Sequence, residues 1–357
     1  VGSEMCIRDS MCGLLLGELL AEDLRFAVFM GLKIAWGPLQ ILLLPVTYLI
    51  FISAVISSKW YGRDEPSYYS LMLILCWLIE MVYLAGHIIL LYAVFEMSII
   101  VSAILVTYGG REGFEAAIKY IVISFIASIP LVTGLSIILL NYLGSLAADL
   151  VSLRVLWILP PSRMLTVAAL LLIAGFGVKA NLIPFHTWIP DTYTAAPTPV
   201  SAAIAGAMPI TGVYGLMLTV APILRNNMLV MSVLMLLGCL SIFLGGLAAL
   251  TQREVKRALA YSSISQLGYS IIALAASSGI GVIAAVMFSV AHGIAKSLMF
   301  ISGCAATSSK DSALYESFKA STWSFAAGSL SLIGIPPLLG FIAKLLVFYA
   351  LIDLLAN

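Results

Sequence analysis

Charged residues are scarce in this chain of 357 residues. Only 10% of them are Asp, Glu, Lys or Arg, whereas a soluble domain carries about 25%. This scarcity excludes a fully water-facing surface, and a net charge of +1 without a basic stripe excludes a nucleic-acid partner. The five cysteines form no CxxC pair, so the sequence predicts neither an iron–sulfur cluster nor a zinc site, and we expect no cofactor in this chain.

Long apolar runs are abundant instead. The chain is 62% hydrophobic, and its mean hydropathy is +1.11. No charged residue occurs in 192–224 or in 258–295, and each stretch exceeds the ~20 residues that a transmembrane helix needs. We therefore predict an all-α protein, a polytopic transmembrane helical bundle with about ten crossings and the lipid bilayer as its surroundings. The predicted apolar windows are 38–57, 69–87, 89–109, 114–140, 164–182, 198–223, 228–250, 258–277, 282–306 and 321–352.

Two of these windows contain prolines that should break a helix. One break begins at Pro184, after Lys179, and the other is Pro336-Pro337, before Lys344. Proline removes a backbone donor and clashes with the preceding turn. Paired broken helices in repeated halves are typical of transporters, whose substrate sites they form.

The spacing of these features predicts how the chain is divided. We expect a non-native or unstructured leader at 1–10 and N-terminal helices at 11–113. A first five-helix repeat should follow at 114–257, and a second, truncated repeat at 258–357. Met11 to Leu24 would be the tail of another helix.

Ionisable residues inside the apolar windows are the candidate functional groups. A charge within a transmembrane helix costs roughly 2.5–3.5 kcal/mol on insertion scales, so by default it indicates function. A carboxylate and a lysine that meet in a low-dielectric site change each other's proton affinity, and histidine exchanges protons near neutral pH. The sequence thus predicts a line of proton-carrying side chains: Glu96, Lys179, His292, Lys296 and Lys344.

Other polar residues have a structural alternative. Glu80 lies near a helix end, where its side chain could simply extend to the interface. His186 and Asp191 are expected to cap and stabilise the broken helix, with a transport role for His186 left open. The Met and aromatic residues are ordinary lipid-facing and core residues.

Three stretches carry a specific resemblance to a known family. They are 177–201 (GVKANLIPFHTWIPDTYTAAPTPVS), 256–269 (KRALAYSSISQLGY) and 291–300 (AHGIAKSLMF). With them the chain resembles the antiporter-like subunits of respiratory complex I, membrane-bound hydrogenases and multisubunit Na⁺/H⁺ antiporters. The similarity begins near residue 26 and continues to the end, and it implies a fragment of a protein with about fourteen helices.

The resemblance also implies roles for single residues. Glu96 matches the glutamate of the family's fifth helix, Lys179 its lysine partner in the seventh, and Lys344 the exit residue of the twelfth. His292 and Lys296 match the central relay of the eleventh helix. The eighth helix usually carries a lysine or histidine, but Ala205 and Ile210 stand where one is expected here. Water and hydroxyl groups would have to bridge this gap, and the candidates are Thr211, Tyr214 and Ser265.

Three functions follow as expectations. The first is a proton-translocating subunit, alternatively a sodium-linked one, of an NADH:quinone oxidoreductase or hydrogenase complex. It would be a non-redox subunit of a translocase, with NADH, quinone, flavin or iron–sulfur groups on partner membrane subunits. The second is a subunit of a cation/proton antiporter, and the third a scaffold that conducts nothing. The expected location is a prokaryotic plasma membrane, with the mitochondrial inner membrane as alternative.

The distribution of basic residues predicts the orientation. Eight Lys or Arg residues lie in loops on one side of the membrane, which we call the basic side, and three lie on the other. Short cytoplasmic loops are enriched in such residues, so we expect the basic side to face the cytoplasm. The eight are Lys59, Arg63, Arg111, Arg253, Lys256, Arg257, Lys310 and Lys319.

Overall fold

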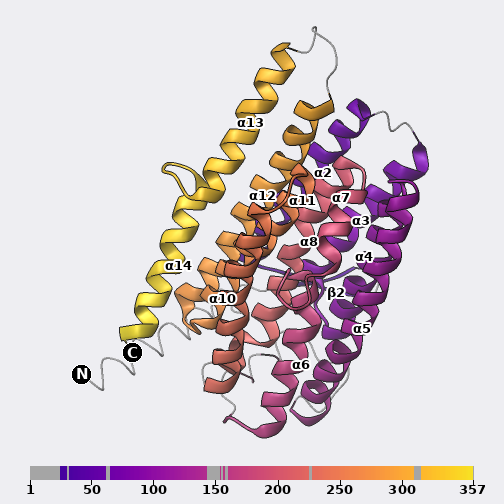
Figure 1. The fold of residues 1–357 in the computed structure, drawn as a ribbon. Coiled ribbons are helices and arrows are strands. Elements are labelled where there is room, and N and C mark those ends of the chain that lie inside the picture. Colours follow the sequence, from indigo (N-terminus) through magenta and orange to yellow (C-terminus); the bar gives the residue numbers. More distant parts are fainter. Residues whose placement is uncertain are drawn as a thin grey trace.

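The computed structural model confirms a polytopic helical bundle (Figure 1). It describes residues 25–29, 32–61, 65–142, 153, 156, 160–224, 227–308 and 315–356. Within that part of the chain, nine helices are long and apolar enough to cross a membrane. Each predicted window corresponds to a helix or to a broken pair of helices. The unbroken ones are α2 (Pro38–Trp60), α3 (Pro66–Leu84), α4 (Ile88–Thr107), α5 (Arg111–Asn141), α8 (Thr198–Thr219), α10 (Met228–Leu250), α11 (Val255–Ala275) and α12 (Gly279–Ser308), with the short α9 (Ala221–Leu224) after α8.

Both predicted breaks are present. The first separates α6 (Arg163–Lys179) from α7 (Trp188–Ala195), and the second separates α13 (Tyr315–Ile333) from α14 (Leu339–Ala356). In Figure 1, α13 and α14 follow one another along one edge of the bundle.

One element was not predicted. A two-stranded antiparallel hairpin, β1 (Arg25–Phe29) and β2 (Leu32–Trp36), precedes α2, with Arg25 opposite Trp36. The hairpin lies within the region 11–113, for which we predict N-terminal helices, but before the first predicted apolar window, which begins at residue 38. The predicted leader at 1–10 and the helix tail at Met11 to Leu24 lie outside the described residues.

The two broken helices end in the same way. Asn181 has a φ of 59° and Gly334 a φ of 87°. The amide of Leu182 donates to the Gly177 carbonyl, and that of Ile335 to the Leu330 carbonyl. A left-handed residue with a bond spanning five residues is the Schellman motif, which ends a helix. The chain therefore stops each first half-helix with a local signal before the prolines.

The backbone groups freed by the first break find partners within the protein, as the bilayer requires. Ser241 of α10 accepts from the amide of Ile183 at 3.0 Å. The indole of Trp188 donates to the Val178 carbonyl at 3.2 Å across the break.

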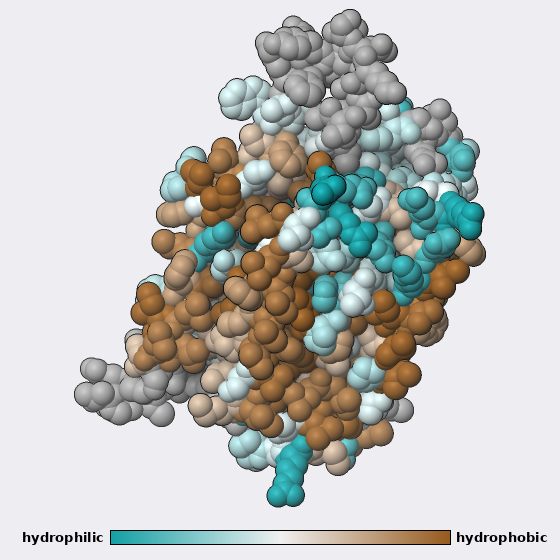
Figure 2. Space-filling view, viewed as in Figure 1, coloured by the Kyte–Doolittle hydropathy of each residue, from teal (hydrophilic) through white to brown (hydrophobic). Residues whose placement is uncertain are grey.

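The outer surface is suited to lipid. Brown apolar residues cover most of the face in Figure 2, and hydrophilic residues gather toward one end of it. The core is formed around α8, whose membrane-spanning window is completely buried. It packs against α12, α6 and α2. A Cβ on Gly212 would lie 2.4 Å from the Ala180 nitrogen, so α8 directly contacts the backbone beside Lys179.

Candidate functional site

Lys179 lies deep inside the bundle. It is the last residue of α6, and only 1% of it is exposed. Its Nζ donates to the Ser98 hydroxyl at 2.6 Å and to the Phe95 carbonyl at 3.3 Å, both on α4. It also lies 4.6 Å from the centre of the Phe95 ring. Because hydroxyl, carbonyl and ring are all neutral, they hold the ammonium group without neutralising it.

Glu96 lies on α4 between the two residues that hold Lys179. Its Oε2 accepts from Ser128 of α5 at 2.6 Å, while its Oε1 is buried without a protein partner. It lines a largely apolar cavity of about 280 Å³ between α4 and α5. The structure thus brings Glu96 and Lys179 within electrostatic range of each other. In the described part of the chain they form no direct ion pair, and each is hydrogen-bonded to a different serine.

His292 and Lys296 lie one turn apart on α12, as predicted, and are 1% and 0% exposed. Lys296 Nζ donates to the Leu259 carbonyl at 2.9 Å and to the Ser262 hydroxyl, both on α11. Both ring nitrogens of His292 are buried without a protein partner. A buried polar atom is normally hydrogen-bonded to protein or water, so the imidazole is available for water in the bundle interior.

Lys344 lies on α14 and reaches back over the second break. Its Nζ donates to the Ile333 carbonyl, the last of α13, at 3.0 Å and lies 5.2 Å from the centre of the Tyr269 ring. A cation at a helix C-terminus is stabilised by the helix dipole. Tyr269 is two turns from Ser262 along α11, or about 10 Å. This helix therefore connects the surroundings of Lys296 with those of Lys344.

The predicted hydroxyl groups around α8 are all engaged in hydrogen bonds. Thr211 donates to the Met208 carbonyl, Tyr214 to the Tyr83 carbonyl and Ser265 to the Ile242 carbonyl. The Tyr214 hydroxyl also receives a bond from Gln40 at 3.3 Å. A role for these three hydroxyls between Lys179 and His292 stays a prediction. Two of them, Thr211 and Tyr214, lie on α8, which packs against both α6 and α12.

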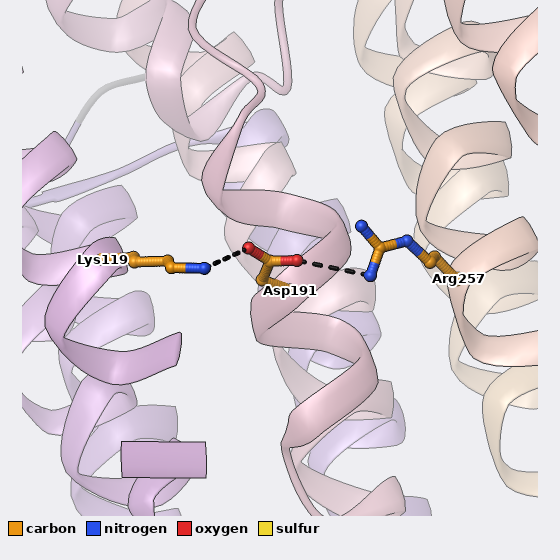
Figure 3. Close-up of polar contacts among 3 residues, drawn as sticks. All are labelled: Lys119, Asp191 and Arg257. Atoms are coloured by element: carbon orange, nitrogen blue, oxygen red, sulfur yellow. Dashed lines mark hydrogen bonds and ion pairs between the residues drawn. The ribbon is translucent and has the colours of Figure 1, made fainter. Parts of the chain in front are cut away.

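The remaining candidates lie at the periphery of the line. Glu80 is 6% exposed, accepts from the Cys76 thiol at 3.4 Å and lines a groove between α2 and α3. His186 lies in the first break, where its Nδ1 is buried without a partner. Asp191 lies on α7 and forms ion pairs with Lys119 and Arg257 (Figure 3); the stabilising role expected for it stays a prediction.

The hydrogen-bonding residues of the line were not predicted from the sequence. Ser98, Ser128 and Ser262 hold Lys179, Glu96 and Lys296 respectively. The sequence carried a signal only for Ser98, which follows Glu96 by two residues in an apolar helix. Ser128 and Ser262 bond to residues on another helix, so they could be recognised only once the packing of the two helices was known.

Comparisons with known proteins place the chain in a family. Residues 85–356 match the family described as NADH:quinone oxidoreductase/Mrp antiporter, transmembrane. The chain therefore belongs to this antiporter-like family, and it is a multi-pass protein of the prokaryotic plasma membrane.

Individual relatives include members of both branches. The NADH-quinone oxidoreductase subunit N 2 of Solidesulfovibrio magneticus is 30% identical over 85% of this chain and 66% of the relative. One of the subunits of the Na(+)/H(+) antiporter of Alkalihalophilus pseudofirmus is 29% identical over 84% of this chain and 62% of the relative. A chain of respiratory complex I from Thermus thermophilus superposes with a TM-score of 0.75 at 26% identity, covering 97% of this chain and 75% of that one. The chain thus spans less than two thirds of the length of the first two relatives.

Proposed function

We propose that this chain is the proton-translocating subunit of a redox-driven membrane complex of the NADH:quinone oxidoreductase type. The observation that carries the proposal is Lys179, a completely buried lysine at the end of a broken helix. It is held by Ser98 rather than by a carboxylate, although Glu96 is near. A lysine with neutral partners can lose its proton without leaving a bare countercharge.

The geometry supports a sequence of steps. A change at Glu96, on the lipid-facing side of α4, alters the electrostatic potential at Lys179. Lys179 then passes its proton inward toward His292 and Lys296, and α11 leads on to Lys344. Moving one charge against 100 mV requires about 2.3 kcal/mol, so the potential change needed at each step is modest. Redox chemistry would take place on partner membrane subunits.

The test is the replacement of Lys179 in the assembled complex. We expect Lys179→Met to reduce the number of protons pumped per electron to that of a complex without this subunit's contribution. Lys59→Met, which removes an exposed lysine at the end of α2, should leave pumping unchanged. If Lys179→Met pumps like the unaltered complex, the proposed function is wrong.

A second candidate function is cation/proton antiport without a redox partner. The match to the Na(+)/H(+) antiporter of A. pseudofirmus favours it. Membrane vesicles distinguish the two, because an antiporter would exchange Na⁺ for H⁺ with no electron donor present. A scaffold would show neither activity, and Glu96→Gln and Lys179→Met would then change only assembly.

A further inference from the structure

A carboxyl group lines the groove between α2 and α3. The groove has a volume of about 310 Å³, roughly ten times that of one water molecule in the liquid, so it has room for a long side chain. Glu80 and Cys76 form its polar floor, where the Cys76 thiol donates to Glu80 Oε1 at 3.4 Å. The hydroxyl of Tyr48, on α2, lies close to the same carboxyl group. The proton line from Glu96 to Lys344 does not include this cluster.

The walls of the groove are apolar and exposed. Four residues that line it expose more than half of their surface, namely Ile52 (55%), Ile56 (56%), Leu73 (64%) and Trp77 (56%). On each helix these residues are four positions apart, so each pair forms a ridge along its helix. Another helix packs between ridges of this kind with its own side chains. The shape of the groove therefore suits a helix that lies along α2 and α3.

Glu80 is held at the depth of the lipid chains. With 19 residues, α3 is about 28 Å long, which matches the hydrocarbon core of about 30 Å. Glu80 lies four residues, or about 6 Å, before the end of α3 at Leu84. Cys76, to which the carboxyl group is bonded, lies one turn further from that end. The side chain is therefore directed into the membrane rather than toward the nearer surface.

The charge of Glu80 has no cationic partner in the described part of the chain. There, no basic side chain lies within ion-pair distance of it, and the side chains close to its carboxyl group are Tyr48 and Cys76. An ionised carboxylate only accepts hydrogen bonds, and the Cys76 thiol donates to this one. Charges inside a membrane are costly and pair with one another. The groove thus offers an acceptor for a cation from a neighbouring molecule.

We propose that the α2–α3 groove is the docking site of a transmembrane helix from a neighbouring membrane subunit, and that this helix places a lysine or arginine against Glu80. The apolar ridges hold the body of the helix. The carboxylate fixes its rotation and depth, because only one register brings the basic residue to Glu80. This contact goes beyond the proposed function and does not depend on it, since a redox-driven complex and an antiporter would both use it for assembly.

Lipid is the competing occupant of the groove. The ammonium group of a phospholipid lies in the polar headgroup layer, outside the hydrocarbon core. Glu80 is instead directed toward Cys76, deeper in the membrane. A basic side chain on a spanning helix reaches this depth, which favours protein over lipid.

The first test identifies the occupant. A photoreactive benzoylphenylalanine replaces Leu73 in the wall of the groove, the chain is irradiated in its native membrane, and the adduct is analysed by mass spectrometry. We expect a peptide from a membrane-spanning segment that contains a lysine or arginine. Phe243 of α10, which is 65% exposed, is the control position and should not capture that peptide. An adduct with phospholipid alone, or with a membrane segment that has no basic residue, would overturn the proposal.

The second test removes the charge. Glu80→Gln keeps the size of the side chain and its bond to Cys76. We expect the fraction of the chain that stays in the complex during purification in mild detergent to fall about fivefold to tenfold, as for the loss of a polar contact between membrane helices. Glu115→Gln is the matched control, because Glu115 is exposed and pairs with Arg111 on its own helix. Equal retention of the two variants would show that the proposal is wrong.

The third test does not depend on the folding of Glu80→Gln. Replacing the partner's basic residue, known from the adduct, by glutamine should reduce retention as much as Glu80→Gln does. The combined variant should lose no more than either single variant, because two residues that act as a pair are not additive. Additive losses would contradict the pairing. Lys179→Met tests the proposed function by proton pumping instead, so the two proposals stand or fail separately.

Discussion

Each of the three membrane lysines is bound by neutral oxygen atoms. Lys179 donates to Ser98, Lys296 to Ser262, and Lys344 to the carbonyl of Ile333. In the described residues none of the three is within ion-pair distance of a carboxylate. A direct carboxylate partner stabilises the charged form strongly. With neutral partners, both the protonated and the neutral form of the lysine can be populated, as a proton-carrying residue requires.

This arrangement predicts the effect of removing one serine. Ser98→Ala should lower the translocation rate by about fivefold to tenfold, because Lys179 loses a hydrogen bond worth roughly 1 kcal/mol or more. Ser102→Ala is the control, since Ser102 lies one turn further along α4 and bonds to Tyr120 instead. The rates would be compared in vesicles holding equal amounts of assembled protein. Equal rates for the two variants would contradict the role of Ser98.

The sequence predicted the ionisable residues of the line but not their partners. Glu96, Lys179 and His292 stand out because charged or titratable groups are costly in an apolar segment. Serine carries no comparable cost and occurs in most of these helices. Which serine faces a lysine depends on how two helices are rotated against each other, and that rotation is set by packing over their whole length.

At the scale of the elements, the two breaks show best what the sequence could predict about the helices. Their positions were predicted because proline cannot continue a helix. The left-handed residues that end α6 and α13 were not recognised, although Asn and Gly are the residues that adopt this conformation most easily. The hairpin at 25–36 was missed as well, since a short apolar segment is compatible with strand or helix.

The end of α13 gives a prediction about stability. Gly334→Val should destabilise the protein by about 1–2 kcal/mol, because a β-branched residue is strained at a positive φ. Its side chain would also displace Lys344, whose Cδ lies 2.9 Å from the position of a Cβ. Gly246→Ala is the control, with its nearest neighbour, the Ser265 hydroxyl, at 3.4 Å. Thermal unfolding in detergent would show a lower midpoint for Gly334→Val only.

The proposed repeats stay a prediction. Two equivalent halves should carry their broken helix in the same place. If the halves began at 114 and 258, α6–α7 would be the second membrane crossing of the first half, and α13–α14 the third of the second half. Starting points at α3 and α10 would make the broken helix the fourth crossing in both, so we propose these as alternative boundaries.

At the scale of the whole molecule, the apolar surface determines where a charge is tolerated. Leu236 and Leu250 of α10 are 58% and 84% exposed, but Leu236 lies near the middle of the helix and Leu250 at its end. Leu236→Lys should reduce the amount of inserted protein, because a lysine at mid-membrane costs about 2.5–3.5 kcal/mol. Leu250→Lys should insert normally, since its side chain reaches the interface.

The measurement is the amount of folded chain in isolated membranes, determined by size-exclusion chromatography after solubilisation. Equal amounts for both variants would mean that this face of α10 is covered by protein rather than lipid.

Contacts between residues that are far apart in the chain could not be predicted from the sequence. Asp191 is separated from Lys119 by 72 residues, and Arg257 comes from a third helix. Nothing in the chain marks these residues as neighbours, because charged groups at helix ends are common near a membrane surface. Only the packing of α7 between α5 and α11 brings them together.

The complete burial of α8 also constrains how the protein is made. Its largest neighbour, α12, ends 89 residues after α8 ends at Thr219. At a synthesis rate of about 5–20 residues per second, the ribosome needs roughly 4–18 s to supply that covering helix. During this interval the small-residue face of α8 must be shielded by lipid or by the insertion machinery. A ribosome that stalls before residue 279 would therefore leave in the membrane a nascent chain whose central helix is still uncovered.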